Sequence, residues 1–505
     1  MTFLSALASK GSRVAAQRPW PRVEVDEPTW REAVVGLAAG EATLLGLWSD
    51  GDAVHLALHG SETPQVLVIS MPCPARRFPS VAIAHPPALR LERVIHDLYG
   101  LEPEDAPDRR RWLDHGRWGV RQPLGVPEPA SAEGDTYPFH AAVGAPLHQI
   151  PVGPVHAGII EPGHFRFSCN GEAVVRLEER LGYVHKGIDG LMRGAPLDRA
   201  AKLAGRTSGD STVAYATAFA RAVEAALGLD VPKRALFLRA LMAELERLAN
   251  HFGDIGAICN DASFSLIHAH CAILREHVLR VANIAFGHRL MMDCVAPGGT
   301  AVDLAPAGAQ ALPTLMRTIR RRFPELVELY DRTASLQNRT ITTGTLKQQL
   351  ARQYGAGGFV GRGSGRAFDA RKLPGYPPYG DLRFEMVVRQ NGDVDARVWV
   401  RIGEIAQSLA LIEQILERLP SGPICADHPP APGQAREGLA LIEGFRGDVL
   451  AWVRIAGEGT IAHCHLRDPS WFQWPLLEAA IAGNIVADFP LCNKSFNCSY
   501  AGHDL

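Results

Sequence analysis

The stretch from residue 231 to residue 256 constrains the fold of this 505-residue chain more than any other. Large apolar side chains recur in it at spacings of three and four residues: Phe237, Leu241, Leu245, Leu248 and Phe252. Such spacing gathers them on the same side of an α-helix, and few faces of this helix look exposed. Asp230 and Pro232 precede the pattern as a start signal. We therefore predict a long helix that is buried on several sides in a central bundle.

Helices also dominate the sequence around this stretch, from 195 to 345. Residues 270–292 predict a second long helix with few exposed faces, and residues around 397–419 predict a third. A Gly- and Pro-rich loop fills 354–381, and a tail of helices and strands follows the third helix.

The N-terminal part of the chain has a different pattern, because strands alternate with helices in it. Residues 52–60 and 64–70 predict strands, and residues 89–101 predict a helix. Farther along, the pair Asn170-Gly171 is a strong hairpin signal. The sequence therefore predicts an α+β chain, with a small α/β domain followed by a mainly α-helical domain that carries peripheral β-hairpins.

A connector rich in Pro, Gly and Ala, at roughly 121–147, separates the two parts. We place the first domain at 1–125, a linker at 126–147 and the second domain at 148–505. The content of 47% hydrophobic and 21% charged residues is typical of globular proteins, and the chain is long enough for such a division.

The net charge and the cysteine content indicate which partners and which cellular compartment to expect. The formal net charge is −2, so we expect no general affinity for nucleic acid. The nine cysteines contain no Cys-x-x-Cys pair, which favours a reducing compartment over a secreted disulfide framework. No run of about 18 apolar residues occurs, so we expect any membrane association to come through a partner.

Three spots rich in glycine or histidine are weak candidates for chemistry. The sequence "GRGSGR" at 361–366 lacks the Gly-Lys-Ser/Thr of a phosphate loop and predicts a structured turn. His156 and His164 lie among glycines and prolines in a loop, where a histidine is more often structural than catalytic. His463 and His465 share one face of a predicted strand, but two ligands are too few for a zinc site.

Glu244, Arg247 and His251 form a polar stripe on the long helix. Buried charges persist in proteins only when they are paired. We interpret the stripe as internal salt bridges that hold neighbouring helices together, with a proton path as the alternative.

Several motifs resemble one protein family, and they follow that family's order along the chain. They are "LERVIHDLYGLEPEDAPDRRRWL" (91–113), "IPVGPVHAGIIEPGHFRF" (150–167), "LGYVHKGIDGLM" (181–192), "GHRLMMDCVAPGGTAVDL" (287–304), "QNRTITTGTL" (337–346) and "YGAGGFVGRGSGRAFDAR" (354–371). Together they resemble the large subunit of energy-converting NiFe hydrogenases of the formate hydrogenlyase type (group 4). That large subunit is related to the quinone-site subunit of NADH-quinone oxidoreductase, the D-type protein of respiratory complex I. The first motif resembles the end of the C-type domain of complex I, fused in front.

By this resemblance, the stretch "GRTSGDSTVAY" at 205–215 corresponds to a metal-binding segment of the family. The family's hydrogenases have Cys-Gly-x-Cys here and a second Cys-x-x-Cys near the C-terminus, and these thiolates bind nickel and iron. The four cysteines align with Ser208, Ser211, Cys498 and Ala501, so one thiolate of four remains. Nickel and low-spin iron need soft, bridging donors, which serine hydroxyls do not replace. The resemblance therefore implies a degenerate NiFe site and no cofactor bound by this chain.

The complex I relative binds quinone through a tyrosine and a loop histidine, whose places here fall on Gly209 and near Pro162, beside His164. Those ligands are thus not carried over residue by residue. Polar residues remain at the old active-site position, and our candidate catalytic residues are Ser208, Asp210, Ser211, Tyr215, His156 and His164. Such a cluster suits binding of a quinone head group or proton relay. The alternative is a cavity filled by water and side-chain hydrogen bonds.

The resemblance implies a peripheral-arm subunit of a membrane-bound, complex I-like oxidoreductase. The complex would act on NAD(P)H, quinone or a related electron donor, and the subunit would have no activity alone. The expected partners are a [4Fe–4S] protein, which is a hydrogenase small subunit or its B-type counterpart in complex I, and antiporter-like membrane subunits. The chain would lie on the cytoplasmic side of the membrane. The alternatives are a non-catalytic scaffold and an atypical hydrogenase large subunit.

Overall fold

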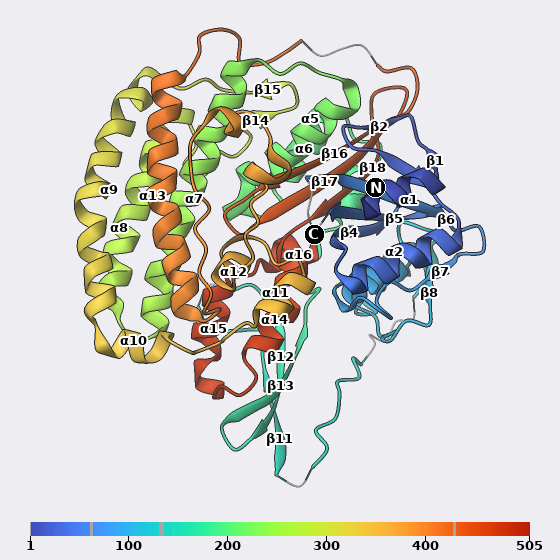
Figure 1. Cartoon of the computed structure of the whole chain (residues 1–505), viewed down its shortest axis with the longest axis horizontal. Helices are drawn as coiled ribbons and strands as arrows, with labels where there is room; N and C mark the ends of the chain where they lie inside the picture. Colours follow the sequence, from blue (N-terminus) through green and yellow to red (C-terminus); the bar gives the residue numbers. More distant parts are fainter. Residues whose placement is uncertain (1, 61–63, 131–135, 145, 159, 428–430) are drawn as a thin grey trace.

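The computed structural model describes residues 2–60, 64–130, 136–144, 146–158, 160–427 and 431–505. Figure 1 shows a helical bundle on one side, the N-terminal region on the other, and a β-sheet between them. None of the helices in the described ranges is both long enough and apolar enough to cross a membrane.

The N-terminal region is built on a sheet with the strand order β1-β3-β6-β5-β4. Its strands are β1 (Ser12–Arg13), β3 (Arg22–Glu24), β4 (Ala42–Ser49), β5 (Ala53–Gly60) and β6 (Val66–Pro72). The helices beside it are α1 (Phe3–Lys10), α2 (Glu27–Ala39) and α3 (Leu89–Tyr99). Strands β5 and β6 and helix α3 confirm the three elements predicted here. Apolar residues of both layers, such as Leu56, Ile69, Trp30 and Leu91, are buried in one core.

The bundle contains α7 (Lys233–Asp261), α8 (Ser265–Phe286), α9 (Pro306–Arg332) and α13 (Val394–Arg418). The prediction for α7 is confirmed, because all five of its spaced apolar residues are buried, with exposed fractions from 0% to 8%. Pro232 is the residue at its N-terminal cap, and no side chain caps it by a hydrogen bond. Helix α13 confirms the third predicted helix.

The predicted extent of α8 is wrong at both ends. The helix begins at Ser265 and ends at Phe286, whereas the sequence predicted 270–292. Gly287 ends it with a φ of +79°, and its N–H donates to the carbonyl oxygen of Asn283. Glycine takes this left-handed conformation without strain, so the apolar pattern that continues beyond it does not extend the helix.

A second sheet, with the order β18-β17-β16-β2, lies between the bundle and the N-terminal region (Figure 1). Its strands are β2 (Gln17–Arg18), β16 (Arg436–Glu443), β17 (Asp448–Ile455) and β18 (Ile461–Arg467). Helix α6 (Thr212–Leu227) packs on β16 and β17. The sheet joins the two ends of the chain, because Gln17 of β2 pairs in parallel with Glu437 of β16.

The predicted hairpin at Asn170-Gly171 is confirmed by β12 (His164–Asn170) and β13 (Ala173–Arg180), with β11 (Leu147–Val152) on the other side of β12. The "GRGSGR" segment spans the end of α12 (Gly358–Gly363) and the turn after it. The C-terminal tail forms α14 (Ser470–Ala480), α15 (Phe489–Phe496) and α16 (Tyr500–Asp504). Shorter elements include β7 (Arg77–Pro79), β8 (Glu102–Glu104), β9 (Val120–Arg121), β10 (Glu128–Pro129), β14 (Val295–Ala296), β15 (Gly299–Thr300), α4 (Ile188–Met192), α5 (Leu197–Gly205), α10 (Ala334–Thr340) and α11 (Gln348–Gln353).

Candidate functional site

The stretch that contains Ser208 and Ser211 forms a tight turn between α5 and α6. Residues Gly209–Ser211 make a single 3₁₀ turn, directly before the first residue of α6. The hydroxyls of Ser208 and Ser211 both donate to Oδ1 of Asp210, at 2.8 Å and 3.3 Å. The structure thus brings three of the predicted site residues together around one carboxylate.

Arg446 joins this group from the tight turn between β16 and β17. Its Nη1 and Nη2 donate to Oδ1 and Oδ2 of Asp210 at 2.8 Å and 2.5 Å, and Nη1 also donates to Oγ of Ser211 at 3.2 Å. Burial alone would raise the pKa of Asp210, but the charge and hydrogen bonds of Arg446 outweigh burial and hold that pKa below its usual value. Asp210 is therefore an anion at neutral pH, and it forms a bidentate salt bridge with Arg446.

The C-terminal tail completes what we call the serine cluster, defined as Ser208, Asp210, Ser211, Arg446 and Ser499. Oγ of Ser499 lies 3.1 Å from Oγ of Ser208. The neighbouring Cys498 is buried, and burial raises the pKa of its thiol, so the thiol keeps its proton. The N–H of Ala501 donates to Oε2 of Glu161 at 3.1 Å.

A cavity of about 440 Å³ borders the serine cluster. Ser208, Cys498 and Ala501 all line it, so three of the four aligned ligand positions do meet in space. Charged residues also line it, among them Asp261 and Lys494. A second cavity of about 290 Å³ shares Asp210, Lys494 and Asn497 with the first. Asp210 therefore borders both spaces.

Tyr215 lies beside the serine cluster and bonds to a different carboxylate. Its hydroxyl donates to Oδ2 of Asp468 at 2.7 Å, and both side chains are buried. Burial and the charge of Asp468 raise the pKa of Tyr215 well above its usual value. A Cβ placed on Gly502 would contact both Oδ2 of Asp468 and Oγ of Ser499. The Asp468 carboxylate that Tyr215 bonds to and Ser499 of the cluster therefore both lie against Gly502.

The two candidate histidines lie elsewhere, His156 in the loop between β11 and β12 and His164 at the first residue of β12. Nε2 of His156 bonds to the carbonyl oxygen of Gly163 at 2.7 Å, and Nδ1 of His164 bonds to that of Gly153 at 3.1 Å. Neither histidine lines the cavity, although Ile160 and Glu161 of the same loop do. The structure thus places both imidazoles where they fix the loop backbone, and it does not bring them to the serine cluster.

Glu246 and Asn250 on α7 also contact this region, and the sequence prediction missed them. The carboxylate of Glu246 accepts from the N–H groups of Val213 and Ala214, at 2.7 Å and 3.2 Å. Burial raises the pKa of Glu246 to about 8. Asn250 donates to the carbonyl oxygen of Asp210 at 2.8 Å. Their spacing of four residues on one helix was a visible signal, but spacing alone does not tell a buried acid from a solvated one.

The polar stripe on α7 forms salt bridges between helices, as predicted. Glu244 pairs with Arg247 at 3.3 Å and with Arg371 at 3.0 Å. His251 bonds to Glu404 of α13 at 2.7 Å, and Glu404 also pairs with Arg362 of α12 at 2.5 Å. We call these six residues the stripe network. Their exposed fractions lie between 0% and 4%, so the network is closed to solvent.

The donors at the four aligned ligand positions do not fit a nickel–iron centre. The Ser208 and Ser211 hydroxyls are hard donors that are already bonded to Asp210, and Ala501 offers only a methyl group. Cys498 alone cannot bridge and hold two soft metals. Within the described ranges, no group of three or more His, Cys, Asp and Glu side chains is placed to hold a metal ion.

Known proteins resemble this chain over most of its length. The family model of the respiratory-chain NADH dehydrogenase 49 kDa subunit matches residues 264–437, and that of the 30 kDa subunit matches residues 31–132. Formate hydrogenlyase subunit 5 of Escherichia coli (strain K12) is 31% identical over 441 residues, which are 85% of this chain and 77% of that protein. The C/D fusion protein of NADH-quinone oxidoreductase from Phocaeicola vulgatus is 26% identical over 475 residues, covering 86% of this chain and 90% of that protein.

A solved structure has the same fold. One chain of the membrane-bound sulfane sulfur reductase, an archaeal respiratory membrane complex, superposes with a TM-score of 0.67 and 25% sequence identity. The match covers 71% of this chain and 98% of that chain.

Proposed function

Because the chain belongs to the family of energy-converting (group 4) hydrogenase large subunits, with a fused region like the C-type domain of complex I, we propose a role for its cavity that needs neither nickel nor iron. Its relatives are subunits of hydrogenases and NADH-quinone oxidoreductases, which are oxidoreductase complexes. In this chain the cavity couples electron transfer in a partner to proton movement, or holds the polar head group of a quinone-type acceptor.

The observation that carries this proposal is the Asp210–Arg446 ion pair at the aligned metal position. A fixed anion–cation pair with three hydroxyls beside it, from Ser208, Ser211 and Ser499, provides both donors and acceptors at a cavity wall. Because Arg446 keeps Asp210 ionised, Asp210 acts by orienting a bound group or water and not by exchanging protons. Glu246, whose pKa of about 8 lies near neutral pH, is better suited to accept and release a proton.

Membership of the family supports a proposal for the partners. We propose a small subunit with a [4Fe–4S] cluster beside the cavity, because this chain has no cysteine quartet for a cluster. Antiporter-like membrane subunits would anchor the complex, with this chain on the cytoplasmic side. The electron donor would be NAD(P)H or a related carrier that binds to other subunits.

The test is metal analysis of the purified complex together with its activities. We expect no nickel per chain, no hydrogen uptake, and turnover with an artificial quinone such as menadione. Nickel near one atom per chain, together with hydrogen uptake, would show that the chain is an atypical hydrogenase subunit.

A further inference from the structure

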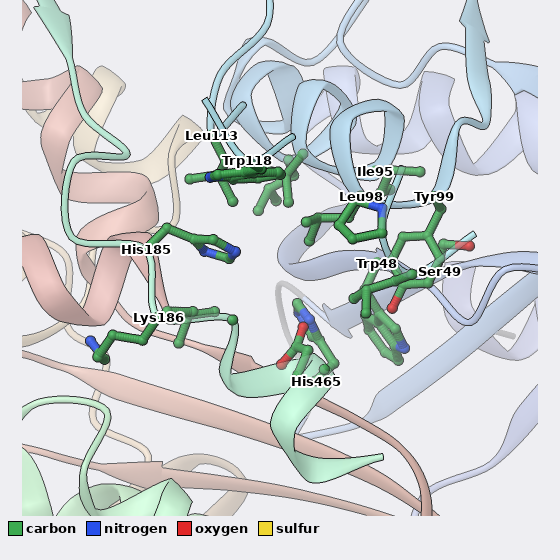
Figure 2. Close-up of a pocket in the computed structure, with 18 of the residues that line it drawn as sticks. Trp48, Ser49, Ile95, Leu98, Tyr99, Leu113, Trp118, His185, Lys186 and His465 are labelled. Carbon is green, nitrogen blue, oxygen red and sulfur yellow. The ribbon is translucent and has the colours of Figure 1, made fainter. Parts of the chain in front are cut away.

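Another cavity, of about 320 Å³ and distinct from the two beside Asp210, lies where the N-terminal region meets the rest of the chain (Figure 2). Its walls come from β4, α3 and residues 113–124 on one side. On the other side they come from residues 185–190, His465 of β18 and the C-terminal Leu505. It shares no lining residue with the cavity at the serine cluster. Binding in this cavity is therefore independent of the function proposed for the serine cluster.

Two stacked ring pairs border this cavity. Trp118 and His185 have ring centroids 4.9 Å apart at 29°, and Trp48 and His465 have centroids 5.1 Å apart at 9°. Figure 2 shows the two pairs on different sides of an open space. Much of the remaining wall is aliphatic and includes Leu91, Val94, Ile95, Leu98, Leu113 and Leu124. A flat, apolar ring fits such walls, because aromatic faces favour stacked and edge-on neighbours.

His185 supplies a hydrogen-bond acceptor. Its Nδ1 lies 2.7 Å from the carbonyl oxygen of Asp504. A carbonyl only accepts, so Nδ1 carries the hydrogen. Burial lowers the pKa of His185, so the ring is neutral at pH 7 and its Nε2 keeps a lone pair. In Figure 2 the ring of His185 reaches toward the open space.

Other polar groups restrict the charge of a ligand. Nε2 of His465 is buried and has no hydrogen-bond partner among the described residues, and burial lowers the pKa of His465 to about 3. Asp189 also lines the cavity, and a second anion beside its carboxyl group would be repelled once that group ionises. Lys186 extends away from the cavity, and its Nζ donates to the carbonyl oxygens of Thr207 and Ala501. Among the described residues that line the cavity, none therefore presents a cationic group to an anion.

We propose that this cavity binds a small, uncharged, planar aromatic molecule that carries a hydroxyl group, a ligand of the phenol class. Its ring lies between the two stacked pairs, and its hydroxyl donates to Nε2 of His185. The volume is at the small end of ligand pockets, which span about 300–1,000 Å³, and suits one or two fused rings. Because both parts of the chain line the cavity, a bound ligand stabilises their junction.

The test is isothermal titration calorimetry on the full-length chain with 2-naphthol as probe. Naphthalene lacks the donor, and 2-naphthoate carries a negative charge. We expect 2-naphthol to bind, naphthalene to bind about 3- to 10-fold more weakly because it lacks one hydrogen bond, and 2-naphthoate to give no signal. Binding of 2-naphthol should also raise the melting temperature, with the logarithm of its free concentration once that exceeds Kd.

Two variants separate the hydroxyl contact from the cavity itself. His185→Asn keeps an N–H donor near Asp504 and removes the Nε2 acceptor, so it should reduce the affinity for 2-naphthol to that for naphthalene. Leu124→Trp fills the cavity and should abolish binding of both, with Val94→Phe as a second filling variant should Leu124→Trp not fold. Val35→Trp, at a side chain of α2 that is 66% exposed, adds a tryptophan away from the cavity and should change nothing.

The proposal is overturned if 2-naphthol does not bind the unaltered chain, or if a folded cavity-filling variant binds it equally well. It is also overturned if naphthalene and 2-naphthol bind with equal affinity and His185→Asn has no effect, since the cavity then recognises only apolar surface.

Discussion

The stripe network and the serine cluster are both built from arginines and carboxylates beside α7, but they differ in their access to solvent. Every charge of the stripe network is at most 4% exposed, and protein groups satisfy it. The side chain of Asp210 in the serine cluster is 35% exposed and borders two cavities. The same residue types thus serve packing in one place and remain available to a ligand in the other. Access, and not charge, therefore separates a structural network from a candidate site in this chain.

Loss of a charge from the stripe network should have the largest effect, and that effect should be on stability. Glu404→Gln removes the carboxylate that Arg362 and His251 share, and leaves Arg362 with reduced pairing in a buried site. Breaking a buried pair costs about 3–5 kcal/mol of unfolding free energy. Denaturant unfolding of the variant would measure this loss. Glu328→Gln, which alters an exposed pair with Arg332, is the control and should change little. Equal stability of the two variants would contradict a structural role for the network.

A substitution in the serine cluster should lower activity more than stability. Asp210→Asn keeps the size of the side chain but removes the charge that Arg446 pairs with. We expect turnover of the assembled complex to fall about 10-fold or more, because a fixed polar group that orients or stabilises a reacting group contributes about 10²–10³ to rates. Complexes of matched subunit content would be compared, with Asp303→Asn at an exposed ion pair as the control. Unchanged turnover would favour the non-catalytic scaffold.

Glu246 should make stability depend on pH. Its folded pKa of about 8 lies above the ordinary value near 4.5, so between these values the folded chain holds a proton that the unfolded chain has lost. Stability should therefore fall as pH rises from about 5 to 8, by up to about 1.4 kcal/mol per pH unit from this group. Glu246→Gln should flatten the melting-temperature profile over that range. Parallel profiles for both proteins would show that Glu246 does not titrate there.

Removal of the Cys498 thiol, the one thiol at the four aligned ligand positions, should have the smallest effect on stability and turnover. Cys498→Ala removes a small, buried, protonated side chain that has no companion thiolates. We expect a loss of about 1 kcal/mol in stability and no loss of turnover. Cys464→Ala, at another buried cysteine outside the serine cluster, should behave alike. Abolished turnover in Cys498→Ala alone would reveal thiol chemistry in the cavity.

The long helix α7 and the hairpin could be predicted from the sequence. Both depend on local patterns, which are the apolar spacing in α7 and the Asn170-Gly171 pair. The predicted C-terminal end of α8 was wrong, because the left-handed conformation of Gly287 ends the helix although the apolar pattern continues beyond it. Local patterns also brought Ser208, Asp210 and Ser211 into one candidate site, because the three lie in one turn.

What those residues contact depends on the packing of the whole chain. Arg446 pairs with Asp210 across 236 positions of the sequence, and His185 bonds to the backbone of Asp504 across 319. Periodicity cannot specify such pairs, because they form only when separate helices and strands pack and exclude water. Packing likewise raised the pKa of Glu246 and turned His156 and His164 toward backbone carbonyls. It also left a cavity between the N-terminal region and the rest of the chain. Burial and long-range contact are properties of the packed chain, and therefore the partners and protonation states of the candidate site became visible only in the fold.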